Sequence, residues 1–170
     1  MRQCPCVFGV ERVDPTHHRR GVQMDRAEAE RRDRVLREFF VGKDWDHNDE
    51  FILKRSLVLR SGELLPDCPF VIDDEWDVLP GHTNHGRGDL VFTDGEGGFA
   101  VVEVKFIDND RSGRTARVKR TKSRGLVVDQ ARTYGEIVAR RDGATREVIA
   151  FTYTNEDPDR VVEVGRYSLA

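Results

Sequence analysis

The sequence lacks the long apolar runs and the paired cysteines that mark several classes of protein. No apolar run approaches the roughly 18 residues that a membrane-spanning helix needs, and the N-terminal segment has no apolar stretch typical of a secretory signal. We therefore expect an intracellular protein with no membrane partner. There are three cysteines, an odd number, and a single residue separates Cys4 from Cys6, so a disulfide framework is not expected.

A large excess of either charge is also absent, but the charges are unevenly distributed along the chain. The 170 residues suffice for one domain with a buried core, and the net charge is -3. Asp67 to Glu103 carries nine acidic residues and one arginine, whereas Lys105 to Arg124 carries eight basic and two acidic residues. An acidic block beside a basic one suits a site for divalent cations next to a groove for phosphates, and it equally suits two solvated faces.

Hydrophobic periodicity predicts an irregular arm at 1–22 followed by one α/β domain at 23–170. A capping box at Asp25 and Glu28 marks the start of the first helix. Helices are expected from Asp25 to Gly42 and from about Thr121 to Arg141, with strands at Val71 to Leu79, Arg87 to Thr93, Phe99 to Ile107, Glu147 to Thr154 and Arg160 to Tyr167. The first three strands are expected to form an antiparallel meander and the last two a hairpin. Lys43 to Pro69 is ambiguous, with a candidate strand at Phe51 to Leu59.

The residues that indicate chemistry are Asp89, Glu103 and Lys105. Glu103 and Lys105 lie two apart in a strand and therefore share a face, and Asp89 on the neighbouring strand can reach the same face. Two carboxylates could bind Mg²⁺, which polarises a phosphate and lowers the pKa of a bound water, while the lysine steadies the developing charge. The structural alternative is a cross-strand ladder of ion pairs on a solvated sheet.

The second helix adds Gln130 and Tyr134, which lie four residues apart on one helical face. The apolar stripe that contains Tyr134 turns this face toward the sheet. Both side chains are therefore expected to meet the carboxylates.

With these residues the sequence resembles the PD-(D/E)XK nuclease superfamily, whose motif is an Asp, a Glu-x-Lys on the next strand and often a Gln-x-x-x-Tyr helix. The similarity runs from Asp25 to Thr154, and Gly88 stands where the motif has its proline. It implies a restriction-endonuclease-like fold, with a central mixed β-sheet flanked by helices. The implied activity is Mg²⁺- or Mn²⁺-dependent endo- or exonucleolytic hydrolysis of DNA that leaves a 5′-phosphate.

The resemblance also implies a role for each residue. Asp89 and Glu103 would bind metal with the Val104 carbonyl, Lys105 would activate or orient the attacking water, Gln130 would position Lys105 or that water, and Tyr134 would touch phosphate. The family further places a glutamate on the first helix. Glu28 or Glu38 could fill that position, and Glu28 could instead serve only the capping box.

The segment between the Glu103 strand and the second helix is basic and is expected to bind phosphate. Its residues are Arg111, Arg114, Arg117, Lys119, Arg120, Lys122 and Arg124. It has no interleaved aromatic residues, which favours contact with the backbone of a duplex or structured nucleic acid over base stacking. The competing hypotheses are a catalytically inactive module of the same fold that binds nucleic acid or a protein, and a plain interaction domain. A homodimer is also considered.

The histidines and cysteines offer weaker candidates for metal or substrate contacts. Cys4, Cys6, His17 and His18 have spacings that do not fit a structural zinc site. His82 and His85 precede Asp89, either in a polar turn or as substrate contacts.

Overall fold

The computed structural model describes residues 24–77, 86–110, 112–141 and 146–168. Its elements are α1 (Arg26–Gly42), α2 (Asp49–Leu59), α3 (Ser61–Leu64), β1 (Phe70–Asp77), β2 (Arg87–Thr93), β3 (Gly98–Lys105), α4 (Arg114–Arg141), β4 (Glu147–Thr154) and β5 (Val162–Ser168). None of the helices in these ranges is long and apolar enough to cross a membrane. The arm at 1–22 lies outside the described residues.

The strands form one five-stranded mixed sheet in the order β1-β2-β3-β4-β5. β1, β2 and β3 pair antiparallel, β3 and β4 pair parallel, and β4 and β5 pair antiparallel. The parallel step requires a long crossover, which α4 provides. The expectations of a mixed sheet flanked by helices, an antiparallel meander and a closing hairpin are therefore confirmed.

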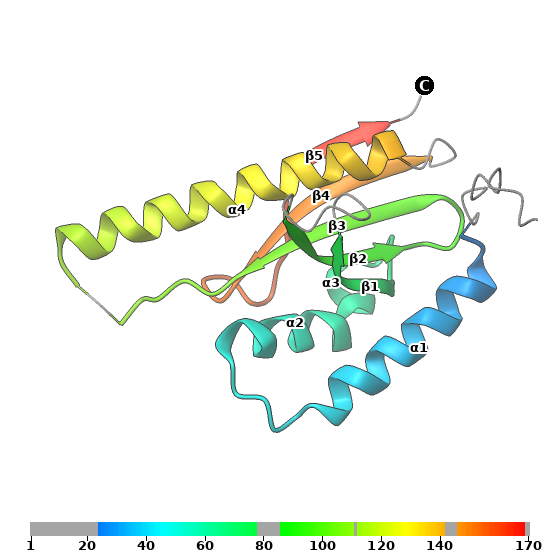
Figure 1. Cartoon of the computed structure of the whole chain (residues 1–170), viewed down its shortest axis with the longest axis horizontal. Coiled ribbons are helices and arrows are strands. Elements are labelled where there is room, and N and C mark those ends of the chain that lie inside the picture. Colours follow the sequence, from blue (N-terminus) through cyan, green and yellow to red (C-terminus); the bar gives the residue numbers. More distant parts are fainter. Residues whose placement is uncertain (1–23, 78–85, 111, 142–145, 169–170) are drawn as a thin grey trace, which may run out of the picture.

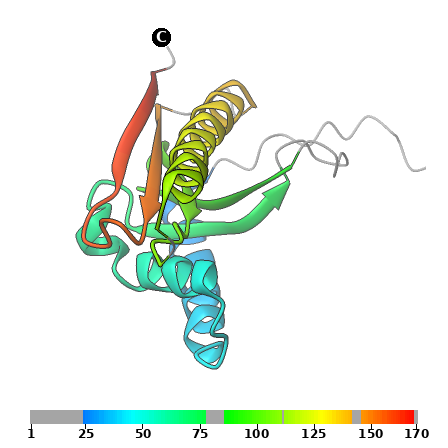
Figure 2. The ribbon, with the colours of Figure 1, turned by 90° about the vertical axis from the view of Figure 1, so that its left-hand side faces the viewer.

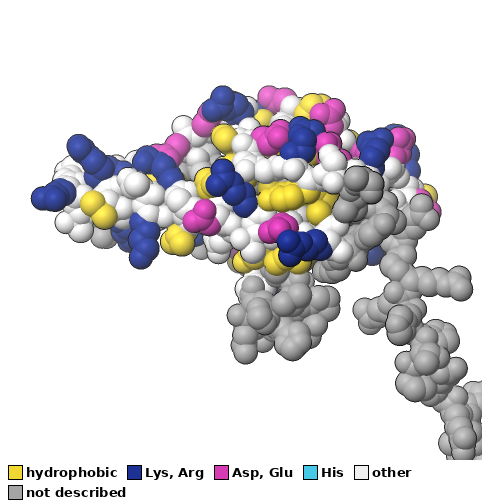
Figure 3. Space-filling view, turned by 90° about the horizontal axis from the view of Figure 1, so that it is seen from above, with side chains coloured by type: hydrophobic (Ala, Val, Ile, Leu, Met, Phe, Trp, Pro, Cys, Tyr) yellow, Lys and Arg dark blue, Asp and Glu magenta, His cyan; other side chains and the backbone are white. Residues whose placement is uncertain are grey.

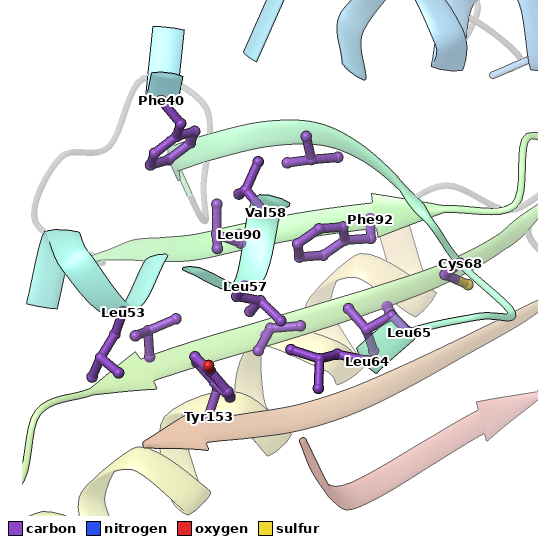
Figure 4. Packing of buried hydrophobic residues seen from close by; sticks show 14 residues of the cluster. Phe40, Leu53, Leu57, Val58, Leu64, Leu65, Cys68, Leu90, Phe92 and Tyr153 are labelled. Carbon is purple, nitrogen blue, oxygen red and sulfur yellow. The ribbon is translucent and has the colours of Figure 1, made fainter. Parts of the chain in front are cut away.

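Helices cover both faces of this sheet, with α4 on one side and α2 and α3 on the other (Figures 1 and 2). On the α2 side, Leu57, Val58, Leu90, Phe92 and Tyr153 are completely buried (Figure 4). These large apolar side chains come from α2 and from two strands, β2 and β4, so their burial fixes α2 against the sheet.

The opposite face packs against α4 through the helical stripe that the sequence predicts. Val127, Ala131, Tyr134 and Val138 are all buried. The Trp76 ring from β1 meets the Tyr134 ring edge to face, with 5.8 Å between their centroids. This contact fixes the position of the helix next to the start of β2, where Trp76 pairs with Gly88.

α1 is joined to the start of β1 by partly buried polar contacts. The Asp33 carboxylate accepts a hydrogen bond from the Val71 amide at 2.8 Å and pairs with Arg37, whose guanidinium also reaches the Val58 carbonyl. The helix begins as expected, because the Asp25 side chain accepts from the Glu28 amide at 2.9 Å.

The candidate strand at Phe51 to Leu59 is wrong, because this segment is helix α2. The Asn48 side chain caps it by accepting from the amides of Glu50 and Phe51, and Leu53 and Leu57 face the core. The second expected helix also begins earlier, at Arg114 and not near Thr121. Most of the basic segment is therefore helical.

Candidate active site

The candidate site lies where β2 and β3 separate. Their ladder begins at the pair Leu90 and Val102, one step inside Asp89 and Glu103. Beyond it, the Glu103 carboxylate accepts from the Asp89 amide at 3.0 Å, and the Asp89 carboxylate accepts from the Val104 amide at 2.8 Å. Hydrogen bonds from these two side chains thus replace the backbone pairing of β2 with β3 at this position. They bring the two acidic residues together as expected.

Lys54 on α2 neutralises Asp89. Its ammonium nitrogen lies 2.9 Å from Asp89 Oδ1 and 3.3 Å from Asp74 Oδ1 on β1. Burial lowers the pKa of Lys54, but the carboxylates of Asp89, Asp74 and Glu75 outweigh burial and leave that pKa raised. Lys54 is therefore a buried cation at the centre of an acidic cluster.

Glu103 is the more buried of the two central carboxylates, with 4% of the residue exposed. Burial and then the negative charge of Asp89 raise the pKa of Glu103 to about 8. The Asp89 amide and Lys54 oppose this rise without cancelling it. Glu103 is thus a carboxylate that a further positive charge would stabilise in its ionised form.

Lys105 lies at the end of β3 and pairs with a second residue of α2. Its Nζ is 2.7 Å from Glu50 Oε2, and its side chain is 41% exposed. The ammonium group is therefore held in place while part of it remains open to solvent, which leaves it able to contact a bound anion.

Tyr134 approaches the carboxylates from α4, as expected, and Gln130 contacts Tyr134. Burial raises the pKa of Tyr134, and the negative charges of Glu103 and Asp89 raise it further. The Gln130 side chain, which hydrogen-bonds to Tyr134, acts in the opposite direction on this pKa. Tyr134 is buried and Gln130 is exposed, so α4 offers a buried hydroxyl near the acidic pair and a solvent-accessible amide next to that hydroxyl.

The Gly-x-Gly lead-in before Asp89 makes room for the aromatic rings beside the site. A Cβ on Gly88 would lie 2.3 Å from the Trp76 indole nitrogen, and one on Gly86 would lie 2.7 Å from the Tyr134 hydroxyl. Gly86 also has a φ of 86°. The two glycines let the chain pass directly under these aromatic side chains.

Backbone strain accompanies the acidic cluster. Glu75 has a φ of 50° and is the one non-glycine residue with a positive φ among the described residues. The flanking pairs, Asp74 with Leu90 and Trp76 with Gly88, set Glu75 opposite Asp89. Such a conformation costs roughly 1–3 kcal/mol and is concentrated at functional sites, which marks this end of the sheet.

The glutamates of α1 are not brought to the acidic pair. Glu28 pairs with Arg31 and Arg32, and these partners lower the pKa of Glu28 to about 2. The start of α1 lies against Gly95, at the turn end of the β2–β3 hairpin and away from Asp89. Glu38 lies with Arg34 and Val41 along an open depression on the α1 surface.

Glu50 is the helix glutamate that contacts the site, and sequence reasoning missed both it and Lys54. The candidate strand at Phe51 to Leu59 leaves Glu50 outside it and gives no reason to place Lys54 near Asp89. The signal that could have found them is the Asn48 cap followed by the four-residue spacing from Glu50 to Lys54.

The basic segment forms the N-terminal part of α4, which projects beyond the sheet. Figure 3 shows Lys and Arg side chains around this projecting end. Those described are Arg114, Arg117, Lys119, Arg120, Lys122 and Arg124. Arg111 lies outside the described residues. Arg124 is anchored by Glu156 at 2.7 Å, whereas Lys119 and Lys122 are exposed.

One side of the projecting helix continues toward the acidic pair. Lys119 is eleven residues before Gln130, which is about three turns at about 100° per residue, so the two share a side of α4. Arg117 lies on the opposite side by the same geometry. The basic charges therefore surround the helix, and only part of them can meet a phosphate chain that enters the site.

The donor atoms at the site fit a hard divalent cation. Among the residues that the structure describes, no group of three or more His, Cys, Asp or Glu side chains could hold a metal ion by itself. Mg²⁺ does not require such a cage, because it commonly uses one or two carboxylates together with water and substrate phosphate. Asp89 and Glu103 supply two carboxylates, and the raised pKa of Glu103 marks a need for positive charge.

Comparison of the chain with protein-family models, curated proteins and solved structures finds no match in any of the three. The remaining candidates from the sequence, Cys4, Cys6, His17, His18, His82 and His85, all lie outside the described residues.

Proposed function

We propose that this chain is a metal-dependent nuclease of the PD-(D/E)XK type with a restriction-endonuclease-like fold, acting on DNA. The observation that carries the proposal is the reciprocal contact of Asp89 and Glu103 at the point where β2 and β3 separate. A ladder of surface ion pairs would leave both carboxylates solvated, whereas Glu103 is buried beside a second acid. That arrangement is costly for stability alone and is typical of a site that binds a cation.

Each residue would contribute to hydrolysis of a phosphodiester. Asp89 and Glu103 would hold Mg²⁺ or Mn²⁺, which supplies Lewis-acid polarisation of the phosphate and a more acidic bound water. Lys105 would orient the attacking water and balance the charge that develops on the phosphate oxygens. Tyr134 and Gln130 would contact the phosphate and the water from the α4 side.

The reaction would consume one water for each bond cleaved. The water oxygen attacks phosphorus, the bond from phosphorus to the 3′ oxygen breaks, and that oxygen takes a proton. The products are a 3′-hydroxyl and a 5′-phosphate. The projecting part of α4 would hold the flanking phosphates, and its lack of aromatic side chains between the basic residues favours a duplex over a splayed single strand.

An inactive module that binds nucleic acid or a protein is the second candidate. It is favoured by the fact that both oxygens of Asp89 already have partners, Lys54 and the Val104 amide. Such a module would keep the basic helix but bind no divalent ion.

Calorimetric titration with Mg²⁺ and Mn²⁺ separates the two functions. The nuclease should bind a divalent ion, and Asp89→Ala and Glu103→Ala should each abolish that binding. A matched control is Asp94→Ala, which removes a carboxylate from the turn end of the same hairpin. If the parent protein binds neither ion, or if the site variants bind as it does, the nuclease proposal fails.

A further inference from the structure

Lys54 pairs with the Asp89 oxygen that does not accept from the Val104 amide. The Val104 amide donates a hydrogen bond to Asp89 Oδ2, and the Lys54 ammonium forms an ion pair with Asp89 Oδ1 at 2.9 Å. With its side chain 8% exposed, Lys54 relies on carboxylates and not on water for its stabilisation. The ammonium therefore supplies Asp89 with the positive charge that a metal ion would supply.

The same face of α2 also neutralises Lys105. Glu50 lies four residues, or about one turn, before Lys54, and its carboxylate is 2.7 Å from the Lys105 ammonium. One helix thus presents a negative and a positive side chain to residues of opposite charge on β3 and β2. Leu53, between them, is buried in the core and fixes this register.

A divalent ion and the Lys54 ammonium cannot share Asp89 without strong repulsion. In a poorly solvated site, like charges a few ångströms apart repel far more than they do in water. Lys54 has an alternative position within reach, because Asp74 Oδ1 lies 3.3 Å and Glu75 Oε1 lies 3.7 Å from its nitrogen. Glu75 is 61% exposed, so movement toward it carries the ammonium outward.

We propose that Lys54 acts as an exchangeable substitute for the metal ion. In the metal-free protein it neutralises Asp89, and on metal binding it withdraws toward Asp74 and Glu75. Lys54 is then a positioning residue that sets how tightly the ion binds. The inference rests on the proposed function, because it takes Asp89 to be a metal ligand.

The affinity for Mn²⁺ tests this exchange directly. Lys54→Met removes the competing charge and should tighten Mn²⁺ binding, measured by calorimetry, by about ten- to a hundredfold. Arg55→Met is the matched control, because it removes the same charge from the next residue of α2, where the guanidinium contacts the Phe40 carbonyl. Its affinity for Mn²⁺ should equal that of the parent.

A second measurement uses the unaltered protein and does not depend on the folding of a variant. Acetylation of lysines, followed by mass spectrometry, should show Lys54 protected without metal and reactive at saturating Mg²⁺. Lys119, which is exposed, should react equally in both conditions.

The outcomes distinguish this inference from the proposed function. If the parent binds Mn²⁺ but Lys54→Met binds it no more tightly, or if Lys54 stays protected at saturating Mg²⁺, the exchange is refuted while the nuclease proposal stands. If neither the parent nor Lys54→Met binds Mn²⁺, the metal site itself is refuted.

Discussion

The buried carboxylate of Glu103 should make the protein less stable as the pH rises from about 5 to about 8. The folded-state pKa of Glu103 is raised from 4.5 to about 8 by burial and by Asp89. In that interval the folded protein keeps a proton that the unfolded chain has lost. The free energy of unfolding should therefore fall with pH, by at most about 1.4 kcal/mol per pH unit for one proton.

Urea denaturation at several pH values measures this dependence, with Glu103→Gln as the comparison. The glutamine imitates the protonated acid, so its free energy of unfolding should vary much less between pH 5 and 8 and should exceed that of the parent near pH 8. Metal-free buffer is essential, because a bound cation would stabilise the ionised form. If the parent's stability rises over this interval, or if Glu103→Gln shows the same slope, our account of this site's electrostatics is wrong.

Three further predictions concern packing, charge and reactivity. In urea denaturation, Gly88→Ala should lower the free energy of unfolding by about 1–3 kcal/mol, because the added Cβ would meet Trp76. Gly125→Ala should raise the free energy of unfolding by about 0.5–1 kcal/mol, because its Cβ would meet nothing within 4 Å in a helix. Equal effects of the two substitutions would refute the packing argument. Lys119→Ala should reduce the slope of log affinity for duplex DNA against log salt concentration by about 0.9, and Arg117→Ala, on the far side of α4, should reduce that slope less. A larger reduction with Arg117→Ala than with Lys119→Ala would refute the side of α4 assigned to DNA. Cys68 should resist alkylation at pH 8 until the protein unfolds, because burial raises the pKa of its thiol to about 12; rapid labelling of the native protein would contradict this.

The sheet could be predicted because its strands carry strong local signals. Arg87 to Thr93 and Glu147 to Thr154 agree with the observed strands, since each is rich in β-branched or apolar residues. α2 could not be identified in the same way, because the exposed Ile52 and Leu59 blur the helical spacing of its buried leucines.

The start of α4 was missed for a different physical reason. Its first turns make no apolar stripe, and Val118, at 61% exposed, points to solvent. These first turns are helical because they continue the half of α4 that packs on the sheet. Extending an existing helix costs less free energy than nucleating a new one. Sequence periodicity reports burial and does not detect a helix that projects beyond the core.

The acidic pair could be anticipated from the spacing of two neighbouring strands, but its cationic partner could not. Asp89 and Glu103 lie on consecutive strands joined by a short turn, so their proximity follows from local pairing. Lys54 reaches Asp89 from a helix 35 residues earlier in the chain, and only the packing of α2 against the sheet brings it there. Contacts of that kind depend on tertiary structure.

Cleavage of duplex DNA by Lys105→Ala tests the central claim most directly. With Mg²⁺ present, the parent should cut the DNA to leave 5′-phosphate ends, and the variant should lose at least about a hundredfold in turnover. Its affinity for the same DNA should stay within about a few fold, because the basic residues of α4 carry the phosphate contacts. If Lys105→Ala cuts as fast as the parent, or if it loses DNA binding with no separate loss of turnover, the assignment of catalysis to this site is contradicted.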